Sequence, residues 1–212
     1  MPRVSDQHLA ARRQQILEAA TRCFTRNGFH QTSMQDVINE AGLSVGAFYR
    51  YFKSKTDLIR AIATGIVGGL ARELDVIVAQ EPLPPLTVAL RQALDTAERR
   101  ADGEARIAVQ VWGESLRDPE LAVLVGDIYR TIRERFVLLA TRARDAGQLP
   151  PDTDPEAVGP VLFGVLQGYL LQRILVGQID VDSYAGGVTA LLPLNSAPAS
   201  GTRVASPSRS RT

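Results

Sequence analysis

The chain has 212 residues, of which 45% are hydrophobic and 22% are charged, and its formal net charge is +1. Such a chain can bury a proper core, and it contains no run of 18 consecutive apolar residues that would predict a membrane-spanning helix. The single cysteine, Cys23, excludes an internal disulfide, and the first residues lack the apolar run of a secretory signal. We therefore expect a globular protein of the cytoplasm.

Charge is distributed unevenly along the chain. Residues 1–60 hold nine basic and five acidic residues, a net charge of +4, whereas residues 61–192 hold 12 basic and 18 acidic residues, a net charge of −6. A basic segment ahead of an acidic one suits a protein that presents one end to a polyanion, although ordinary compositional scatter would give the same difference.

Apolar residues recur at helical spacing almost throughout, and the alternating pattern of strands is absent, which predicts an all-α fold. The first helix is expected over residues 7–27. Thr32 and Gln35 form a capping-box pattern, so a second helix is predicted to start near Ser33 and to end at Gly42.

Two further helices complete the N-terminal part. A short helix is predicted over residues 45–52, with Ser44 as its N-cap. Ser54 and Asp57 make another capping-box pattern, which opens a long helix that ends near Gln80. Three helices followed by a long one indicate a helix-turn-helix domain joined to a larger helical part.

The proline-rich segment 81–85 interrupts the helical pattern. Beyond it, helices are predicted over residues 86–100, 104–116, 119–146, 155–177 and 181–192. The last residues are mainly Ser, Pro, Ala and Arg and are expected to be disordered, because they cannot bury enough surface. The predicted division is therefore a helix-turn-helix domain (1–55), a larger helical domain (56–192) and a tail (193–212).

The short helix has an unusual distribution of side chains. Phe48 and Phe52 are four residues apart and share one face, so they point into the core. Tyr49, Arg50 and Lys53 then face outward, next to the only other lysine of the chain. A solvated helix would need none of these exposed aromatic and basic groups, and the pattern favours a helix that enters a DNA groove.

Residues 9–58 resemble the DNA-binding domain of the tetracycline-repressor (TetR/AcrR-type) transcriptional regulators. The resemblance is carried by Ile16-Leu17-Glu18-Ala19-Ala20, Phe24, Gly28-Phe29, Thr32-Ser33-Met34, Val37-Ile38, Ala41-Gly42-Leu43-Ser44, the run from Gly46 to Lys55, and Leu58. It implies a repressor that binds a palindromic operator as a homodimer and is released by a small molecule. The remaining helices resemble the family's ligand-binding and dimerisation domain in layout only.

The resemblance also implies which residues meet DNA. Major-groove contacts are expected from the recognition helix and its cap, namely Ser44, Val45, Gly46, Ala47, Tyr49 and Arg50. Phosphate contacts are expected from Thr32, Ser33, Tyr51, Lys53 and Lys55. Among these, Arg50 would pair with guanine, and Lys55 is the foremost phosphate contact.

In the C-terminal part, pairing of two chains is predicted through the last two helices, which would form a four-helix bundle, because the helix over 155–177 is apolar on more than one face. Packing of both faces within one chain is the alternative. The expected dimer contacts are Val161, Gly164, Val165, Gly168, Tyr169 and Gln172. The expected effector site is formed by Gln110, Trp112, Glu114, Tyr129, Phe163 and Gln167, although such aromatic residues also occur as plain core. The excess of acidic residues points weakly to a cationic effector. The long helix that starts behind the DNA contacts is expected to swing when the effector binds and so to change the separation of the two recognition helices.

The sequence leaves two alternatives to a ligand-responsive regulator. An enzyme is not favoured, because Cys23 falls on a buried helix face, the two histidines have simple solvated explanations, and the sequence offers no metal-ligand cluster, no phosphate-binding glycine loop and no cofactor site. A DNA-binding regulator that has no small effector, or that answers to a protein partner, remains the alternative.

Overall fold

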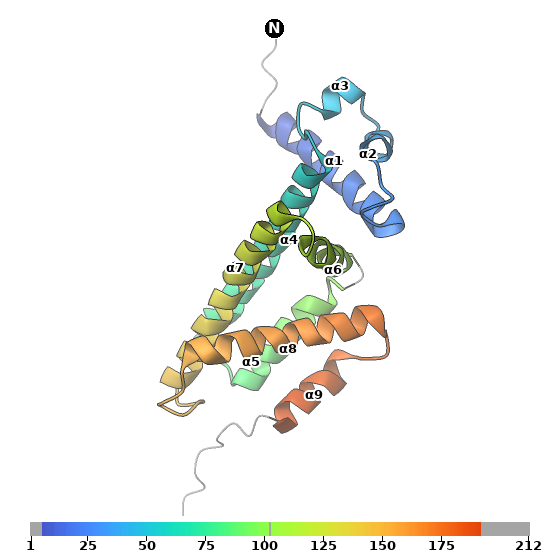
Figure 1. The fold of residues 1–212 in the computed structure, drawn as a ribbon. Helices are drawn as coiled ribbons and strands as arrows, with labels where there is room; N and C mark the ends of the chain where they lie inside the picture. Colours follow the sequence, from blue (N-terminus) through green and yellow to red (C-terminus); the bar gives the residue numbers. More distant parts are fainter. Residues whose placement is uncertain (1–5, 102, 192–212) are drawn as a thin grey trace, which may run out of the picture.

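The computed structural model describes residues 6–101 and 103–191, and within these ranges it contains nine helices and no strand (Figure 1). The helices are α1 (Asp6–Asn27), α2 (Met34–Ala41), α3 (Val45–Phe48), α4 (Lys55–Val78), α5 (Leu86–Glu98), α6 (Glu104–Ser115), α7 (Pro119–Asp145), α8 (Pro155–Leu175) and α9 (Val181–Leu191). The all-α prediction is confirmed. The predicted tail, 193–212, lies outside the described residues.

Helices α1 to α3 form a small unit at one end of the molecule, which we call the head (residues 6–54; Figure 1). Its core is made of side chains that are at most 4% exposed, among them Ile16, Phe24, Val37, Phe48 and Phe52. Side chains from three helices can exclude water only if they pack around one centre, and this packing determines which face of α3 is exposed to solvent.

The start of α2 differs from the prediction by one residue. Ser33, not Thr32, is the N-cap, and its partner in the capping box is Asp36, not Gln35. The Ser33 amide donates to the Asp36 carboxylate at 2.8 Å, and the Asp36 amide donates to Ser33 Oγ at 3.1 Å. The Thr32 hydroxyl is unavailable as a cap because it is turned into the head.

Helix α3 is shorter than predicted. It ends at Phe48 rather than Phe52, because the Tyr51 amide donates to the Phe48 carbonyl, three residues back, at 2.9 Å. The amides of Lys53 and Ser54 donate to the Asp57 carboxylate, each at 3.1 Å, and belong to the start of α4. The capping box predicted at the start of α4 is thereby confirmed. Both phenylalanines are buried nevertheless, since a tight turn continues the coil beyond α3.

Helix α4 joins the head to the rest of the chain, which we call the body (α5–α9). Its first turns, with Leu58 and Ile59, belong to the core of the head, and its last turns, with Leu74 and Ile77, belong to the core of the body. Helix α7 lies beside it along much of its length (Figure 1). The head therefore shares core residues with its neighbours, and the division at residue 55 stays a prediction.

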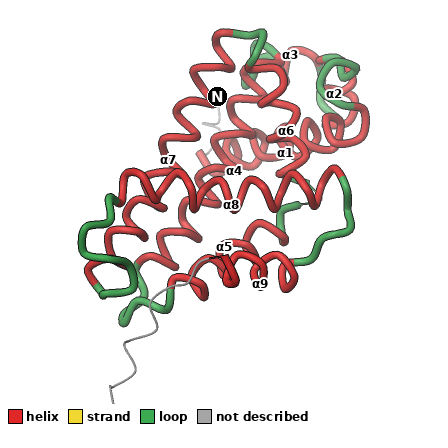
Figure 2. Tube along the Cα trace, turned by 60° about the horizontal axis from the view of Figure 1, so that its bottom comes forward, coloured by secondary structure: helices red, strands yellow, loops and turns green. Residues whose placement is uncertain are grey.

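In the body, α7 and α8 pack most closely, with α5 and α9 stacked beyond α8, as Figure 2 shows. Helix α8 is also the one described helix whose length and composition would suit a membrane span, which the sequence reading overlooked. Leu162, Leu166 and Tyr169 bury one side of it in the core, and Arg173 pairs with Glu98 of α5 at 3.1 Å. These contacts hold one side of α8 against the core of the body.

Candidate nucleic-acid interface and internal cavity

The outer face of α3 is free of protein contacts over most of its length. Val45 is 50% exposed and Tyr49 is 37% exposed, and Gly46 and Arg50 are exposed as well. Phe48 on the opposite face is fully buried. This is the orientation predicted for a helix that presents its side chains to bases, and Ala47 is half-buried at its edge.

A left-handed turn sets the position of α3 against α2. Gly42 has φ +65°, a conformation that glycine adopts at little cost, and it ends α2. The amide of Leu43 then donates to the Ile38 carbonyl at 3.3 Å. Ser44 caps α3 by accepting from the amide of Ala47 at 3.4 Å, so this hydroxyl serves the fold, and its base contact stays a prediction.

A hollow of about 220 Å³ lies beside α3, between it and the first turns of α1. Arg12 and Arg50 both line it, together with His8, Ala47 and Tyr51. No role was predicted from the sequence for the residues of α1 that line this hollow. Tyr51 is half-buried against the head and is less exposed than predicted.

Both lysines hold the backbone of the head. Lys53 Nζ donates to the Tyr49 carbonyl at 2.5 Å, at the end of α3. Lys55 Nζ lies 4.2 Å from the centre of the Phe29 ring and 3.4 Å from the His30 carbonyl. Partial burial lowers the pKa of Lys55 from its ordinary value. Their phosphate contacts stay predictions, and they are compatible with the internal bonds, because each ammonium group has three donors.

The prediction of a phosphate contact by the Thr32 side chain is wrong. Thr32 is 1% exposed, and its hydroxyl donates to the carbonyls of Cys23 and Gly28 at 3.2 and 2.8 Å. Ser33 is exposed, but Asp36 accepts from both its amide and its hydroxyl, and these bonds lower the pKa of Asp36. A phosphate at this helix start would have to compete with that carboxylate.

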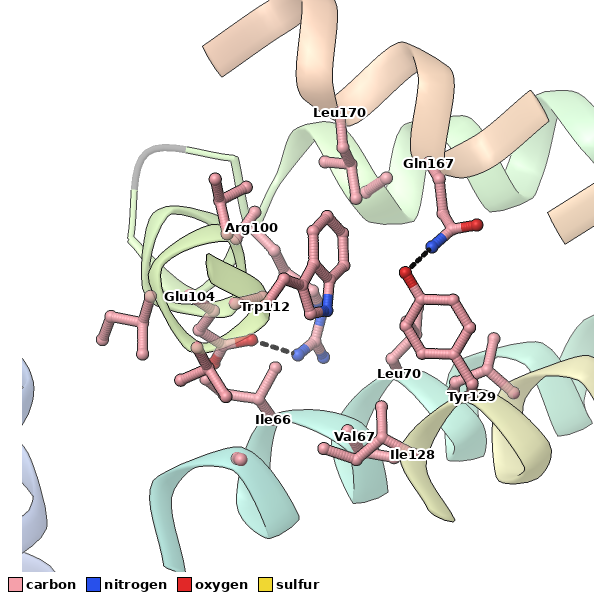
Figure 3. A pocket seen from close by; sticks show the side chains of 18 of the residues that line it. Ile66, Val67, Leu70, Arg100, Glu104, Trp112, Ile128, Tyr129, Gln167 and Leu170 are labelled. Carbon is pink, nitrogen blue, oxygen red and sulfur yellow. Dashed lines mark hydrogen bonds and ion pairs between the residues drawn. The ribbon is translucent and has the colours of Figure 1, made fainter. Parts of the chain in front are cut away.

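The body encloses a cavity of about 90 Å³, bounded by α4, α6, α7 and α8 (Figure 3). Four of the six predicted effector residues line it: Trp112, Tyr129, Phe163 and Gln167. The Tyr129 ring meets the Trp112 and Phe163 rings edge-on, with centroids 6.1 and 5.3 Å away. Apolar side chains make up most of the remaining wall, for example Ile66, Val67, Leu70, Val111, Val125, Ile128 and Leu170.

Polar groups close the cavity at two places. Arg100 donates to Glu104 and to Glu73, each at 2.5 Å, and the bond from Arg100 lowers the pKa of Glu73 to about 2. At the other place, Gln167 Nε2 donates to the Tyr129 hydroxyl at 2.5 Å. Since drug-sized ligands occupy roughly 300 Å³ or more, the cavity must open to accept one.

The placement of Gln110 and Glu114 in the effector site is wrong. Gln110 accepts from the amide of Phe29 at 2.9 Å, and Glu114 lies 2.6 Å from His30 Nε2, so both side chains contact the head. Residues two apart on a helix point about 200° apart, and Trp112 takes the side of the cavity. Helix α6 therefore has one face on the cavity and the other on the head.

The outer side of α8 is apolar and uncovered within one chain. Val161 is 63% exposed and Leu175 is 71% exposed, and Gly164 and Gln172 are exposed between them. Tyr169, however, is fully buried, and its hydroxyl donates to Glu98 at 2.5 Å. Its assignment to a dimer interface is therefore wrong. Val165 and Gly168 are half-buried.

Reactive groups outside these regions are few. Cys23 is fully buried against the core of the head, and burial raises the pKa of its thiol, which fits the predicted role of a small apolar side chain. Within residues 6–101 and 103–191, no three His, Cys, Asp or Glu residues are grouped to hold a metal ion.

Comparison with known proteins covers both parts of the chain. The family "Bacterial regulatory proteins, tetR family" matches residues 16–62, and "Tetracyclin repressor-like, C-terminal domain" matches residues 82–186. The HTH-type transcriptional regulator YfiR of Bacillus subtilis (strain 168) is 34% identical over 190 residues, which is 85% of this chain and 89% of that protein.

Two further relatives agree with this match over nearly their whole length. The HTH-type transcriptional regulator UidR of Escherichia coli (strain K12) is 28% identical over 185 residues, covering 85% of this chain and 90% of UidR. The structure of GusR from Salmonella enterica matches with a TM-score of 0.72 at 25% identity, covering 90% of this chain and 99% of GusR. The fold, the sequence matches and the exposed face of α3 therefore all agree with a helix-turn-helix regulator.

Proposed function

The chain belongs to the tetR family of bacterial regulatory proteins, which makes it a DNA-binding transcriptional regulator and not an enzyme, and we propose that it is a ligand-released repressor. The proposed repressor binds a palindromic operator as a homodimer in the cytoplasm. The observation that carries the proposal is the outer face of α3 and of the turn that continues it, where Tyr49 and Arg50 are exposed beside a buried Phe48. Arg50 would read guanine, and the flanking basic groups would hold phosphates.

A homodimer is supported by the apolar outer side of α8. One head reads a half-site weakly, and two heads one turn of DNA apart would read both halves of a palindrome. A charge at Val161 should prevent pairing if this side of α8 is the interface, because an uncompensated carboxylate would be buried there. Light scattering of Val161→Glu should then give the mass of one chain, with wild type at twice that mass. The same mass for both proteins would contradict the interface.

A response to a small molecule is supported by the contacts of α4 and α6. Both helices line the cavity, and both contact the head. Glu114 binds His30, and the His30 carbonyl accepts from Lys55, at the start of α4. An effector that binds better to a state with α4 and α6 shifted would move the heads apart, and the difference in its affinity for the two states sets the effect. In this proposal, α6 as well as the predicted α4 transmits effector binding to the head.

The experiment for the proposed function is footprinting of bound genomic fragments from the source organism. Two protected half-sites related by a dyad, about one helical turn apart and overlapping a promoter, are the expected result. A single half-site, or protection without sequence preference, would contradict the palindrome and the homodimer.

The coupling is tested by Glu114→Gln, which keeps the size of the side chain but removes its charge. Operator affinity without effector should change little, and release by an effector should weaken severalfold, because α6 would hold the head less firmly. Glu134→Gln, an exposed position on α7, is the matched control. Equal release from wild type and both variants would favour the alternative, a regulator whose DNA binding does not depend on a small molecule.

A further inference from the structure

Two hollows of the body meet at three shared side chains. The internal cavity of about 90 Å³ lies on one side, and an open groove of about 450 Å³ between α7 and α8 lies on the other. Tyr129, Phe163 and Gln167 line both hollows. These three side chains therefore form a thin wall between an apolar interior and the surface.

The wall is closed by a single neutral hydrogen bond. Gln167 of α8 donates to the hydroxyl of Tyr129 of α7 at 2.5 Å, and Figure 3 shows the two side chains meeting tip to tip at the edge of the cavity. The end of the cavity toward α1 is closed instead by Arg100 with Glu104 and Glu73. Charge-assisted bonds are roughly twice as strong as neutral ones, so the wall between α7 and α8 opens more easily.

The groove outside this wall carries positive charge. Arg130 and Arg133 of α7 line it, with Gly126 and Pro160 on the remaining sides. Arg130 is paired with Asp127 at 2.9 Å. Arg133 is exposed, and in the part of the chain that the structure describes no carboxylate lies within ion-pair distance of it. The cavity thus opens toward an uncompensated guanidinium.

We propose that the body binds amphipathic anions, with the apolar part in the cavity and a carboxylate, sulfate or phosphate group at Arg133, and that they enter between α7 and α8 past Tyr129 and Gln167. This inference rests on the proposed response to a small molecule and names the chemical class of the effector. It reverses the expectation of a cationic effector, since Glu104, the acidic residue that lines the cavity, is already paired with Arg100.

The head group is tested with three probes that have a ten-carbon chain and differ in charge: decanoate, decanol and decyltrimethylammonium. Trp112 is the only tryptophan of the chain and lines the cavity, so its emission reports occupancy directly. Decanoate should bind about fivefold more tightly than decanol, as expected for one partly exposed ion pair, and the cation should bind most weakly. Equal affinities, a preference for the cation, or no change in emission with any probe would overturn the proposal.

The role of Arg133 is tested by Arg133→Gln, with Arg117→Gln as the matched control. Both arginines are exposed, and Arg117 lies outside the cavity and the groove. The preference for decanoate over decanol should vanish in Arg133→Gln and persist in Arg117→Gln. A preference that survives Arg133→Gln would place the anion elsewhere and contradict the assignment.

The route is tested by association rates in stopped flow. Tyr129→Phe removes the hydrogen bond across the wall and should speed decanoate binding severalfold, whereas Tyr184→Phe should not. Tyr184 is the matched control because its hydroxyl donates to the Val165 carbonyl of α8, away from the groove. Identical rates in wild type and both variants would contradict entry between α7 and α8.

Binding and regulation can fail separately. If decanoate binds with the expected dependence on Arg133 but leaves operator affinity unchanged, the ligand site stands and the proposed release fails. If operator DNA is released by a neutral or cationic molecule while decanoate does not bind, release stands and the inference about anions fails.

Discussion

The head and the body place their candidate binding residues differently: outside the core in the head, and inside it in the body. In the head, the core is filled, and the residues assigned to DNA lie on the outside of a helix held by Phe48 and Phe52. In the body, the residues assigned to an effector lie inside, around space that Trp112 and Tyr129 leave unfilled. A filled core fixes the geometry of a surface, whereas an unfilled one can change shape when a molecule enters it.

The largest expected effect separates a filled core from a cavity wall. Phe48→Ala removes a fully buried ring and should lower the free energy of unfolding by about 3–5 kcal/mol. Phe163→Ala, on the cavity wall, should cost less, because one side of that ring already faces open space. Urea denaturation followed by circular dichroism measures both free energies of unfolding. Equal losses for the two variants would contradict the proposed difference between the core of the head and the cavity wall of the body.

The next effect compares two glycines on α8. A Cβ on Gly159 would lie 2.8 Å from the Val137 amide nitrogen, so Gly159→Ala must push α7 away and should cost about 1–3 kcal/mol. Within a single chain, a Cβ on Gly164 would meet nothing within 4 Å, so Gly164→Ala should stabilise the helix by up to about 1 kcal/mol when both glycine variants are made in the monomeric Val161→Glu protein. Thermal unfolding of the two variants should therefore shift in opposite directions. Shifts of the same sign would show that α7 and α8 are not held at this distance.

The smallest effect concerns the charged end of the cavity. The bond from Arg100 lowers the pKa of Glu73 to about 2, against about 4.5 in the unfolded chain. A lowered pKa in the folded state adds stability above pH 4.5, and this contribution disappears as the pH falls toward 2. Glu73→Gln should therefore cost up to about 1 kcal/mol at pH 7 and nothing near pH 2. A cost that is independent of pH, or one matched by Glu134→Gln, would contradict the role of this pair.

The sequence predicted the head well because its signals are local. Capping residues, the glycine at position 42 and the spacing of Phe48 and Phe52 act within a few residues, so they determine which side of α3 faces water. The errors there are also local: Thr32 and Ser33 are both plausible caps, and only packing decides which hydroxyl turns inward.

The body was predicted less well because its site depends on how helices meet. The positions of the helices followed from periodicity, yet a buried aromatic residue and a cavity-lining one have the same spacing. Gln110 and Glu114 could be assigned to the head only once the position of α6 against α1 was known. Likewise, the burial of Tyr169 depends on Glu98 of a distant helix, for which the sequence has no local signal.

The most direct test of the account is the ratio of affinities for the operator and for a scrambled duplex. Arg50→Ala should lower this ratio by the equivalent of roughly 1–3 kcal/mol, because a base contact is lost. Lys53→Ala should weaken binding to both duplexes and leave the ratio unchanged. If Arg50→Ala discriminates between the two duplexes as well as wild type does, the outer face of α3 does not read DNA, and the central claim is wrong.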